Sequence, residues 1–147
     1  MLCLLITLLA LQSQSSVVNT FPGADETRLW SQGLADGRNF DYTVKTAALS
    51  KVPKWTPEKQ NPPLSFPRAV EIAQHAVKAD HPEFHELMVW SFRLQHVGAL
   101  EFQNRWFYVV EMYPMVGGKL SYQTEISVVV LMDGTVVKPT EKARTVR

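Results

Sequence analysis

The chain has 147 residues and 46% hydrophobic content, which indicates one globular domain. Its formal net charge is +1, so it has no strongly basic surface of the kind that attracts nucleic acid or an anionic membrane. No segment resembles a nucleic-acid-binding module, and the only cysteine is Cys3.

The first 24 residues carry no charged side chain, and Leu2 to Leu11 is a nearly continuous apolar run. This run is too short to span a membrane and has the length of a leader segment. We expect residues 1–20 to be a signal peptide, with an uncleaved interfacial anchor as the alternative. Removal of the leader would also remove Cys3, so we expect an exported protein without disulfides, periplasmic or extracellular if the source is bacterial.

Residues 21–62 form an N-terminal extension in this interpretation. Ala24 to Leu34 is predicted to be a short helix, and the loose alternation from Phe40 to Leu49 indicates an extra strand. Lys51 to Pro63 is rich in proline and is expected to be a rigid connector. Trp55 is expected to dock on the core and hold this connector in place.

The strongest helix signal follows Ser65, which is a favourable N-cap residue. Pro67 lies in the first turn, where its missing N–H costs nothing, and Pro82 ends the helix near Asp80. At about 100° per residue one stripe of the helix is apolar. This stripe contains Ala69, Val70, Ile72, Ala73, Ala76 and Val77.

From Glu86 onward the apolar residues recur at every second position, which predicts strands. Three long strands are expected, over Glu86–Val97, Arg105–Tyr113 and Ser121–Met132. Their helix-facing side is expected to carry Met88, Trp90, Phe92, Leu94, Trp106, Tyr108, Val110, Met112, Tyr122, Ile126, Val128 and Val130.

Asp133-Gly134 signals a two-residue turn before a short strand at 135–137. The connections are too short for crossover helices, so the strands are expected to be antiparallel. The expected fold is α+β, with one main helix packed on a curled antiparallel sheet of three to five strands. A bulge somewhere in the sheet would allow the curl. The charged tail 140–147 is expected to fray.

With these elements placed, residues 63–139 resemble PepSY-like domains of the wider cystatin-like α+β group. The matching segments are Pro63-Leu64-Ser65 followed by 69–73, then 105–111 and 128–136. The resemblance implies a roll-shaped fold and a non-enzymatic, exported or envelope-located module. It implies roles in peptidase inhibition or regulation, or in ligand binding, and no catalytic residues. The extension before residue 63 departs from the family pattern.

Two sets of residues could carry chemistry. His81 and His85 have the spacing of metal ligands on a helix, but Pro82 lies between them, which favours solvated loop histidines and no metal site. Arg93 is predicted to lie opposite Val109, with Glu111 within diagonal reach, and Val109 to lie opposite Glu125. The two glutamates suit either acid–base catalysis or a cross-strand charge cluster, and the cluster is favoured because no third partner is implied.

The sheet face away from the helix combines apolar and charged side chains, so either residues 21–60 cover it or it is a contact surface. The predicted contact residues are Val89, Arg93, Phe107, Val109, Glu111, Tyr113, Glu125 and Val129. The predicted function is a non-catalytic exported binding or regulatory module for a protein, peptide or envelope component, with no cofactor. A homodimer through this face is a further possibility, and a carrier of an apolar small molecule between sheet and helix is the alternative function.

Overall fold

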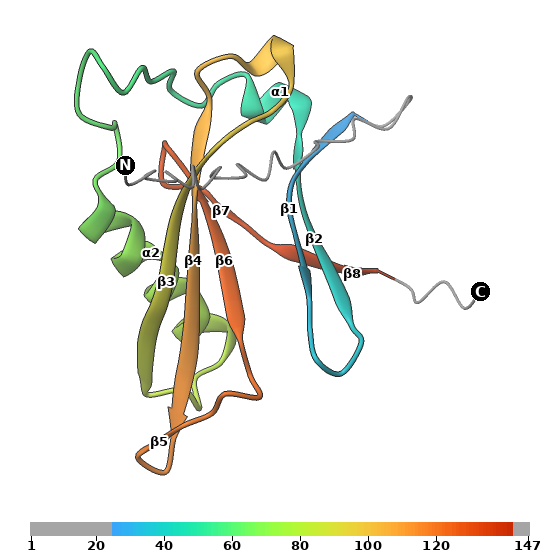
Figure 1. Cartoon of the computed structure of the whole chain (residues 1–147), viewed down its shortest axis with the longest axis vertical. Helices are drawn as coiled ribbons and strands as arrows, with labels where there is room; N and C mark the ends of the chain where they lie inside the picture. The colour runs from blue at the N-terminus through green and yellow to red at the C-terminus, as the bar shows by residue number, and fades with distance from the viewer. Residues whose placement is uncertain (1–24, 143–147) are drawn as a thin grey trace, which may run out of the picture.

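In the computed structural model, which describes residues 25–142, the fold is α+β with two antiparallel sheets and one main helix (Figure 1). The predicted leader 1–20 lies outside the described residues. No helix within 25–142 is long and apolar enough to cross a membrane. The strands are β1 (Glu26–Gly33), β2 (Asn39–Lys45), β3 (Glu86–His96), β4 (Trp106–Val116), β5 (Lys119–Leu120), β6 (Ile126–Leu131), β7 (Val136–Val137) and β8 (Pro139–Lys142). The helices are α1 (Thr46–Leu49), α2 (Phe66–Asp80) and the 3-10 turn η1 (Leu100–Phe102).

The predicted main helix is confirmed as α2. Ser65 occupies the N-cap position, but its hydroxyl makes no capping hydrogen bond; its carbonyl accepts from the Ala69 N–H instead. Ala69, Ala73 and Val77 are buried, so the alanine-rich stripe lets the helix lie close to the sheet. The Tyr108 hydroxyl donates to the Leu64 carbonyl (2.7 Å) and ties the helix entry to the sheet.

The larger sheet has the order β3-β4-β6-β7, with β5 paired to β4. Figure 1 shows α2 behind β3, β4 and β6. The side chains of Tyr108, Val110, Met112, Val128 and Val130 are buried in the core. The predicted register between the first two strands is confirmed, since Arg93 lies opposite Val109.

A bulge in β3 changes which face its side chains occupy. The β3–β4 register shifts between Val89 and Ser91, so Trp90 is the extra residue. Before the bulge Val89 pairs with the buried Met112, and after it Phe92 pairs with the buried Val110. The prediction that Met88 and Trp90 face the helix is therefore wrong, because one inserted residue reverses the alternation. Trp90 is instead 59% exposed.

The third predicted strand is shorter than expected. β4 and β5 pair around Gly117-Gly118, and the Ser121 N–H still donates to the Pro114 carbonyl. Pro114 has no N–H and cannot donate a second hydrogen bond to this segment, which favours an interruption of the ladder at this point. The chain then leaves the sheet until Ile126, so Val109 pairs with Val129 and not with Glu125. Tyr122, expected to face the helix, lies in this excursion and is 69% exposed.

The turn before β7 has three loop residues, one more than predicted. Val130 pairs with Val136, and the Leu131 N–H donates to the Thr135 carbonyl. The Gly134 N–H donates to the Leu131 carbonyl, and Gly134 has φ +88°. This is a β-turn followed by a left-handed residue, a conformation that glycine adopts without a steric penalty.

The N-terminal extension forms a second sheet with the order β1-β2-β8. The predicted helix at Ala24–Leu34 is wrong, because Thr27 and Leu29 are buried at alternate positions of strand β1. The extra strand predicted near Phe40 is present as β2. Part of the expected frayed tail is also strand, since residues 139–142 pair with β2. Residues 143–147 lie outside the described part.

The second sheet packs against the face of the larger sheet that α2 leaves uncovered. The buried Tyr42 of β2 donates its hydroxyl to the Ser127 carbonyl of β6 (2.7 Å). Coverage by the extension is thus the correct alternative for much of this face. The connector also docks as expected: Trp55 is buried, packs on Trp106, and its backbone N–H donates to the Asn104 carbonyl.

Candidate functional site

The eight predicted contact residues separate into three groups. Phe107, Val109, Glu111 and Val129 are buried, so the structure does not expose them to a partner. They were expected on the surface because the pattern of a mixed sheet face does not show that a second sheet covers it. Val89 is partly buried in the core and pairs with Met112. Arg93, Tyr113 and Glu125 keep some exposure on the face opposite the helix.

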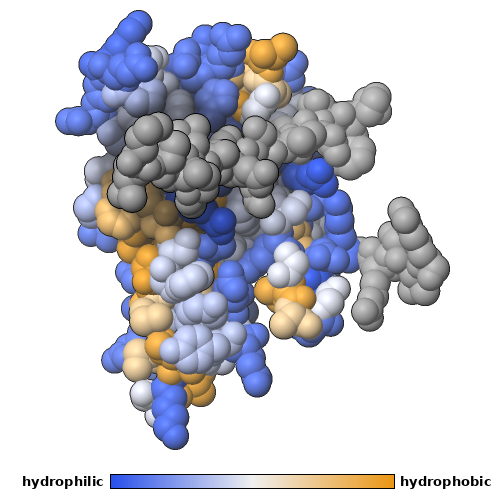
Figure 2. Space-filling view, viewed as in Figure 1, coloured by the Kyte–Doolittle hydropathy of each residue, from blue (hydrophilic) through white to orange (hydrophobic). Residues whose placement is uncertain are grey.

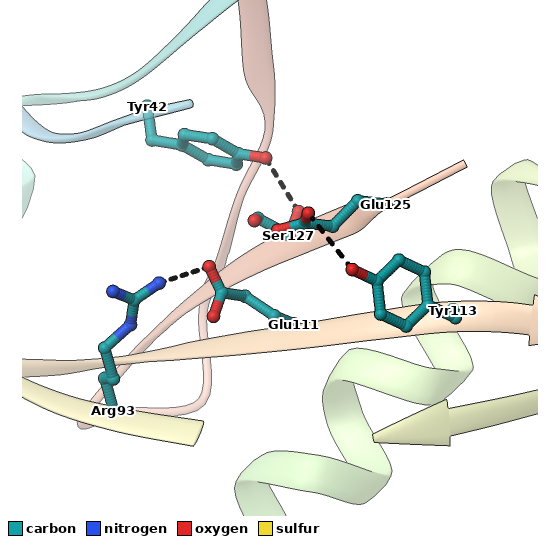
Figure 3. Close-up of polar contacts among 6 residues, drawn as sticks. All are labelled: Tyr42, Arg93, Glu111, Tyr113, Glu125 and Ser127. Atoms are coloured by element: carbon teal, nitrogen blue, oxygen red, sulfur yellow. Dashed lines mark hydrogen bonds and ion pairs between the residues drawn. The ribbon is translucent and has the colours of Figure 1, made fainter. Parts of the chain in front are cut away.

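Arg93 makes an ion pair within the larger sheet and a ring contact to the smaller one. Its guanidinium pairs with the Glu111 carboxylate, as the diagonal register predicts (Figure 3). It also lies over the Trp30 ring of β1, with 4.6 Å from Cζ to the ring centroid. Glu111 is only 6% exposed, so the cation compensates a largely desolvated carboxylate. Burial raises the pKa of the nearby Tyr42 phenol above its ordinary value of 10, and the Glu111 charge adds to this shift.

Further along the same face, three aromatic rings form a row in which the first and last are exposed and the middle one is partly exposed. The Trp90 and Tyr113 centroids are 6.1 Å apart, and the Tyr113 and Tyr122 centroids are 5.3 Å apart. Met88 pairs directly with Tyr113 and is 38% exposed. We call Met88, Trp90, Tyr113 and Tyr122 the aromatic surface.

The aromatic surface lies where the larger sheet extends past the smaller one. In Figure 1 the β5 end of the sheet continues beyond the region beside β1 and β2. Figure 2 shows apolar and weakly polar side chains along this end of the molecule. Large side chains that add nothing to a core, gathered on one face, are typical of a binding surface.

Glu125 borders the aromatic surface. The Tyr113 hydroxyl donates to its carboxylate with an O···O distance of 3.4 Å, a long hydrogen bond (Figure 3). Burial and the charge of Glu125 raise the pKa of Tyr113 above 10. Within residues 25–142 no lysine or arginine forms an ion pair with Glu125.

The geometry separates the two glutamates that the sequence analysis grouped together. Glu111 pairs with Arg93, whereas Glu125 precedes β6 and contacts Tyr113. The two carboxylates therefore have different partners and do not form one hydrogen-bonded pair. His81 and His85 are both exposed, and the His81 ring stacks on Phe84 and contacts Glu83.

Two hollows lie beside α2. One of about 90 Å³ lies between the end of α2 and strands β6 and β7, and its lining includes Val77, Ile126 and Val137. The other, about 600 Å³, is lined by Arg68, Glu71, Ile72, Gln74, His75 and Lys78. All of these belong to α2, so among the described residues no second element closes that hollow.

The sequence pattern missed the exposed position of Trp90 and Tyr122. For Tyr122 a signal was present, because Gly117-Gly118 before it and the polar neighbours Ser121, Gln123 and Thr124 are typical of a loop. For Trp90 the alternation of apolar residues predicted the wrong face of the sheet, because the apolar pattern does not show where a strand contains a bulge. Trp30 was also left without a role, and it contacts Arg93.

Comparisons with known proteins found no matching family model, no matching curated protein and no matching solved structure.

Proposed function

We propose that this protein is a non-catalytic exported binding module that holds a protein or peptide partner on the aromatic surface. The observation that carries the proposal is the contiguous row Trp90–Tyr113–Tyr122, in which the exposed Trp90 and Tyr122 flank the partly exposed Tyr113. Tryptophan and tyrosine contribute much of the energy of protein interfaces, because they bury a large area while ordering few rotatable bonds. Trp90 and Tyr113 belong to the paired strands β3 and β4, and Tyr122 lies in the loop between β5 and β6.

We also propose the PepSY-like relationship for residues 63–139. Its support is the sequence of elements, in which an amphipathic helix is followed by an antiparallel meander from β3 to β7. The second sheet is an addition to that pattern. Export is proposed from the apolar run Leu2–Leu11 alone.

The alternative function, transport of an apolar small molecule between helix and sheet, receives no support from the cavity found there. Its volume is about 90 Å³, whereas drug-sized ligands occupy roughly 300 Å³ or more.

Selection of displayed random peptides tests the proposed function. Peptides would be selected on the wild-type domain and screened against Trp90→Ser/Tyr122→Ser. The matched control is Leu100→Ser, which removes a side chain that is 85% exposed in η1. We expect the selected peptides to bind wild type and the control equally and to lose at least tenfold in affinity on the double variant. Two outcomes would refute the proposal: selected peptides that bind all three proteins equally, or a selection that yields no binding peptide.

Self-association is a competing occupant of the same surface. Sedimentation of the wild type and the double variant over a range of concentrations separates it from peptide binding. A dimer that disappears in the double variant would assign the aromatic surface to a second copy of the chain and would contradict the peptide proposal.

A further inference from the structure

Where the two sheets meet, the chain already forms one complete site for a cation, with Trp30 from β1 and with Arg93 and Glu111 from β3 and β4. Trp30, Arg93 and Glu111 combine a ring face, a guanidinium and a carboxylate, with the Arg93 Cζ 4.6 Å from the Trp30 centroid. In this arrangement the ring and the carboxylate stabilise the same positive charge from two directions. The chain itself supplies all three groups.

The aromatic surface repeats two of these three groups on the same face. Tyr113 follows Glu111 by two positions in β4, so the two side chains lie on the same face of the sheet. Trp90 and Tyr122 flank the Tyr113 ring, and the Glu125 carboxylate contacts its hydroxyl. The described part of the chain supplies no lysine or arginine to pair with Glu125.

The state of Glu125 favours an incoming cation. The hydrogen bond that Tyr113 donates to the Glu125 carboxylate is long at 3.4 Å, so the carboxylate retains acceptor capacity for a stronger charge-assisted bond. Glu111 is neutralised locally by Arg93, whereas no lysine or arginine within residues 25–142 pairs with Glu125. Glu86 lies opposite Met115 at the end of the β3–β4 pair that carries Met88 and Tyr113. It adds a second negative charge at the end of the sheet where the aromatic surface lies.

We propose that the aromatic surface with Glu125 binds a lysine or arginine side chain of a peptide partner. The cationic head would lie over the Trp90, Tyr113 and Tyr122 rings and bond to Glu125, and its methylene stem would pack on Met88. The inference rests on the proposed function and specifies the chemistry of its partner.

Nuclear magnetic resonance titration tests the inference. The peptide acetyl-Ala-Val-Arg-Val-Ala-amide would be compared with its lysine, citrulline and norleucine analogues, following the indole N–H signal of Trp90, which Trp90→Phe assigns. We expect the arginine and lysine peptides to shift this signal saturably and to bind about fivefold more tightly than the neutral analogues, as for a partly exposed cation–π contact.

The variant Glu125→Gln isolates the carboxylate. We expect it to lower the preference for arginine over citrulline without abolishing it, because the three rings remain, while Glu101→Gln, which removes the same charge from η1, preserves the full preference. Backbone amide spectra confirm that each variant keeps its fold.

The outcomes distinguish the two proposals. Equal binding of arginine and citrulline peptides, unaffected by Glu125→Gln, would overturn the cation inference and leave the peptide-binding function standing. Tetramethylammonium that binds as tightly as the arginine peptide would also overturn it, by indicating a free quaternary ammonium ligand. Peptide binding that never perturbs Trp90 would contradict the proposed function itself.

Discussion

Arg93 is the residue that connects the two sheets electrostatically. Its guanidinium contacts Glu111 on the neighbouring strand and Trp30 on the second sheet. Because Glu111 is buried, removal of Arg93 would leave a carboxylate with little solvation and no cation. The cost of that isolated charge is larger than the value of the ion pair itself.

We therefore expect Arg93→Met to lower the free energy of unfolding by about 2 kcal/mol. The double variant Arg93→Met/Glu111→Leu is expected to recover at least half of that loss, because no charge then remains buried. Urea unfolding monitored by circular dichroism measures both. A double variant that is less stable than the single variant would contradict this, by showing that the Arg93–Glu111 ion pair stabilises the fold by more than the cost of desolvating its two charges.

Asp41 is the second buried charge, and it holds β8 to β2. Its carboxylate contacts Lys142 Nζ at 2.6 Å and Arg28 at 3.6 Å. Burial opposes ionisation of Asp41, but hydrogen bonds from Lys142 and Ser31 and the charges of Lys142 and Arg28 outweigh it. Together they hold its pKa below the ordinary value of 3.8.

A depressed pKa predicts a specific dependence of stability on pH. The stabilisation by Asp41 is complete above pH 3.8 and is lost as the pH falls through the lower pKa of the folded state. We expect Asp41→Asn to be less stable than wild type at pH 7, with the difference shrinking below pH 3.8. Thermal unfolding at a series of pH values measures this. The control Asp36→Asn changes an exposed carboxylate in the β1–β2 turn and should leave the stability at pH 7 almost unchanged.

At the level of elements, the bulge in β3 decides on which face of the sheet Trp90 lies. Without it, Trp90 would face α2, as the alternation predicted. With it, Trp90 and Tyr113 lie together on the opposite face.

The tryptophans give a direct test of this arrangement. Trp55 is 6% exposed and donates to the Gln60 carbonyl, whereas Trp90 is 59% exposed. We expect Trp55→Ala to cost about 3 to 5 kcal/mol of unfolding free energy and Trp90→Ala less than about 0.5 kcal/mol. Denaturation midpoints compare the two directly. Similar losses at both positions would place Trp90 in the core, where the sequence pattern had it.

The elements also show how far local patterns extend. The α2 bounds and the Arg93–Val109 register follow from apolar spacing and connection length, which are local properties. The β4–β6 register does not, because the excursion after Ser121 depends on Pro114, a residue on the other strand. The Arg93–Glu111 contact was predictable because the predicted register between β3 and β4 is correct at Arg93. The position of Glu125 was predicted wrongly because it was derived from the register between β4 and β6, which differs from the predicted one.

For the whole molecule, β8 is the connection that makes one fold from two sheets. The chain passes from β7 of the larger sheet through Lys138 into β8 of the smaller sheet. The pairing of 139–142 with β2 thus joins residues about a hundred positions apart. Such pairing between distant segments is expected to form more slowly than the local β1–β2 hairpin.

Two truncations isolate the contribution of β8. A chain ending at Lys142 retains the strand, and a chain ending at Lys138 lacks it. We expect the shorter chain to have a lower melting temperature and faster hydrogen exchange at the β2 amides, with β4 and β6 still protected. Identical exchange in β2 for both chains would show that β8 does not hold the extension.

The sequence by itself determined the α+β class, the main helix, the meander and the first strand register, because each depends on the spacing of apolar residues along one segment. Only the tertiary structure decided that a bulge exposes Trp90, that β8 completes a second sheet, and that this sheet covers Phe107, Val109 and Val129 while leaving Tyr113 accessible. The physical reason is that these features arise from backbone pairing between distant segments, and periodicity within a segment does not specify which partner lies beside it or on which face.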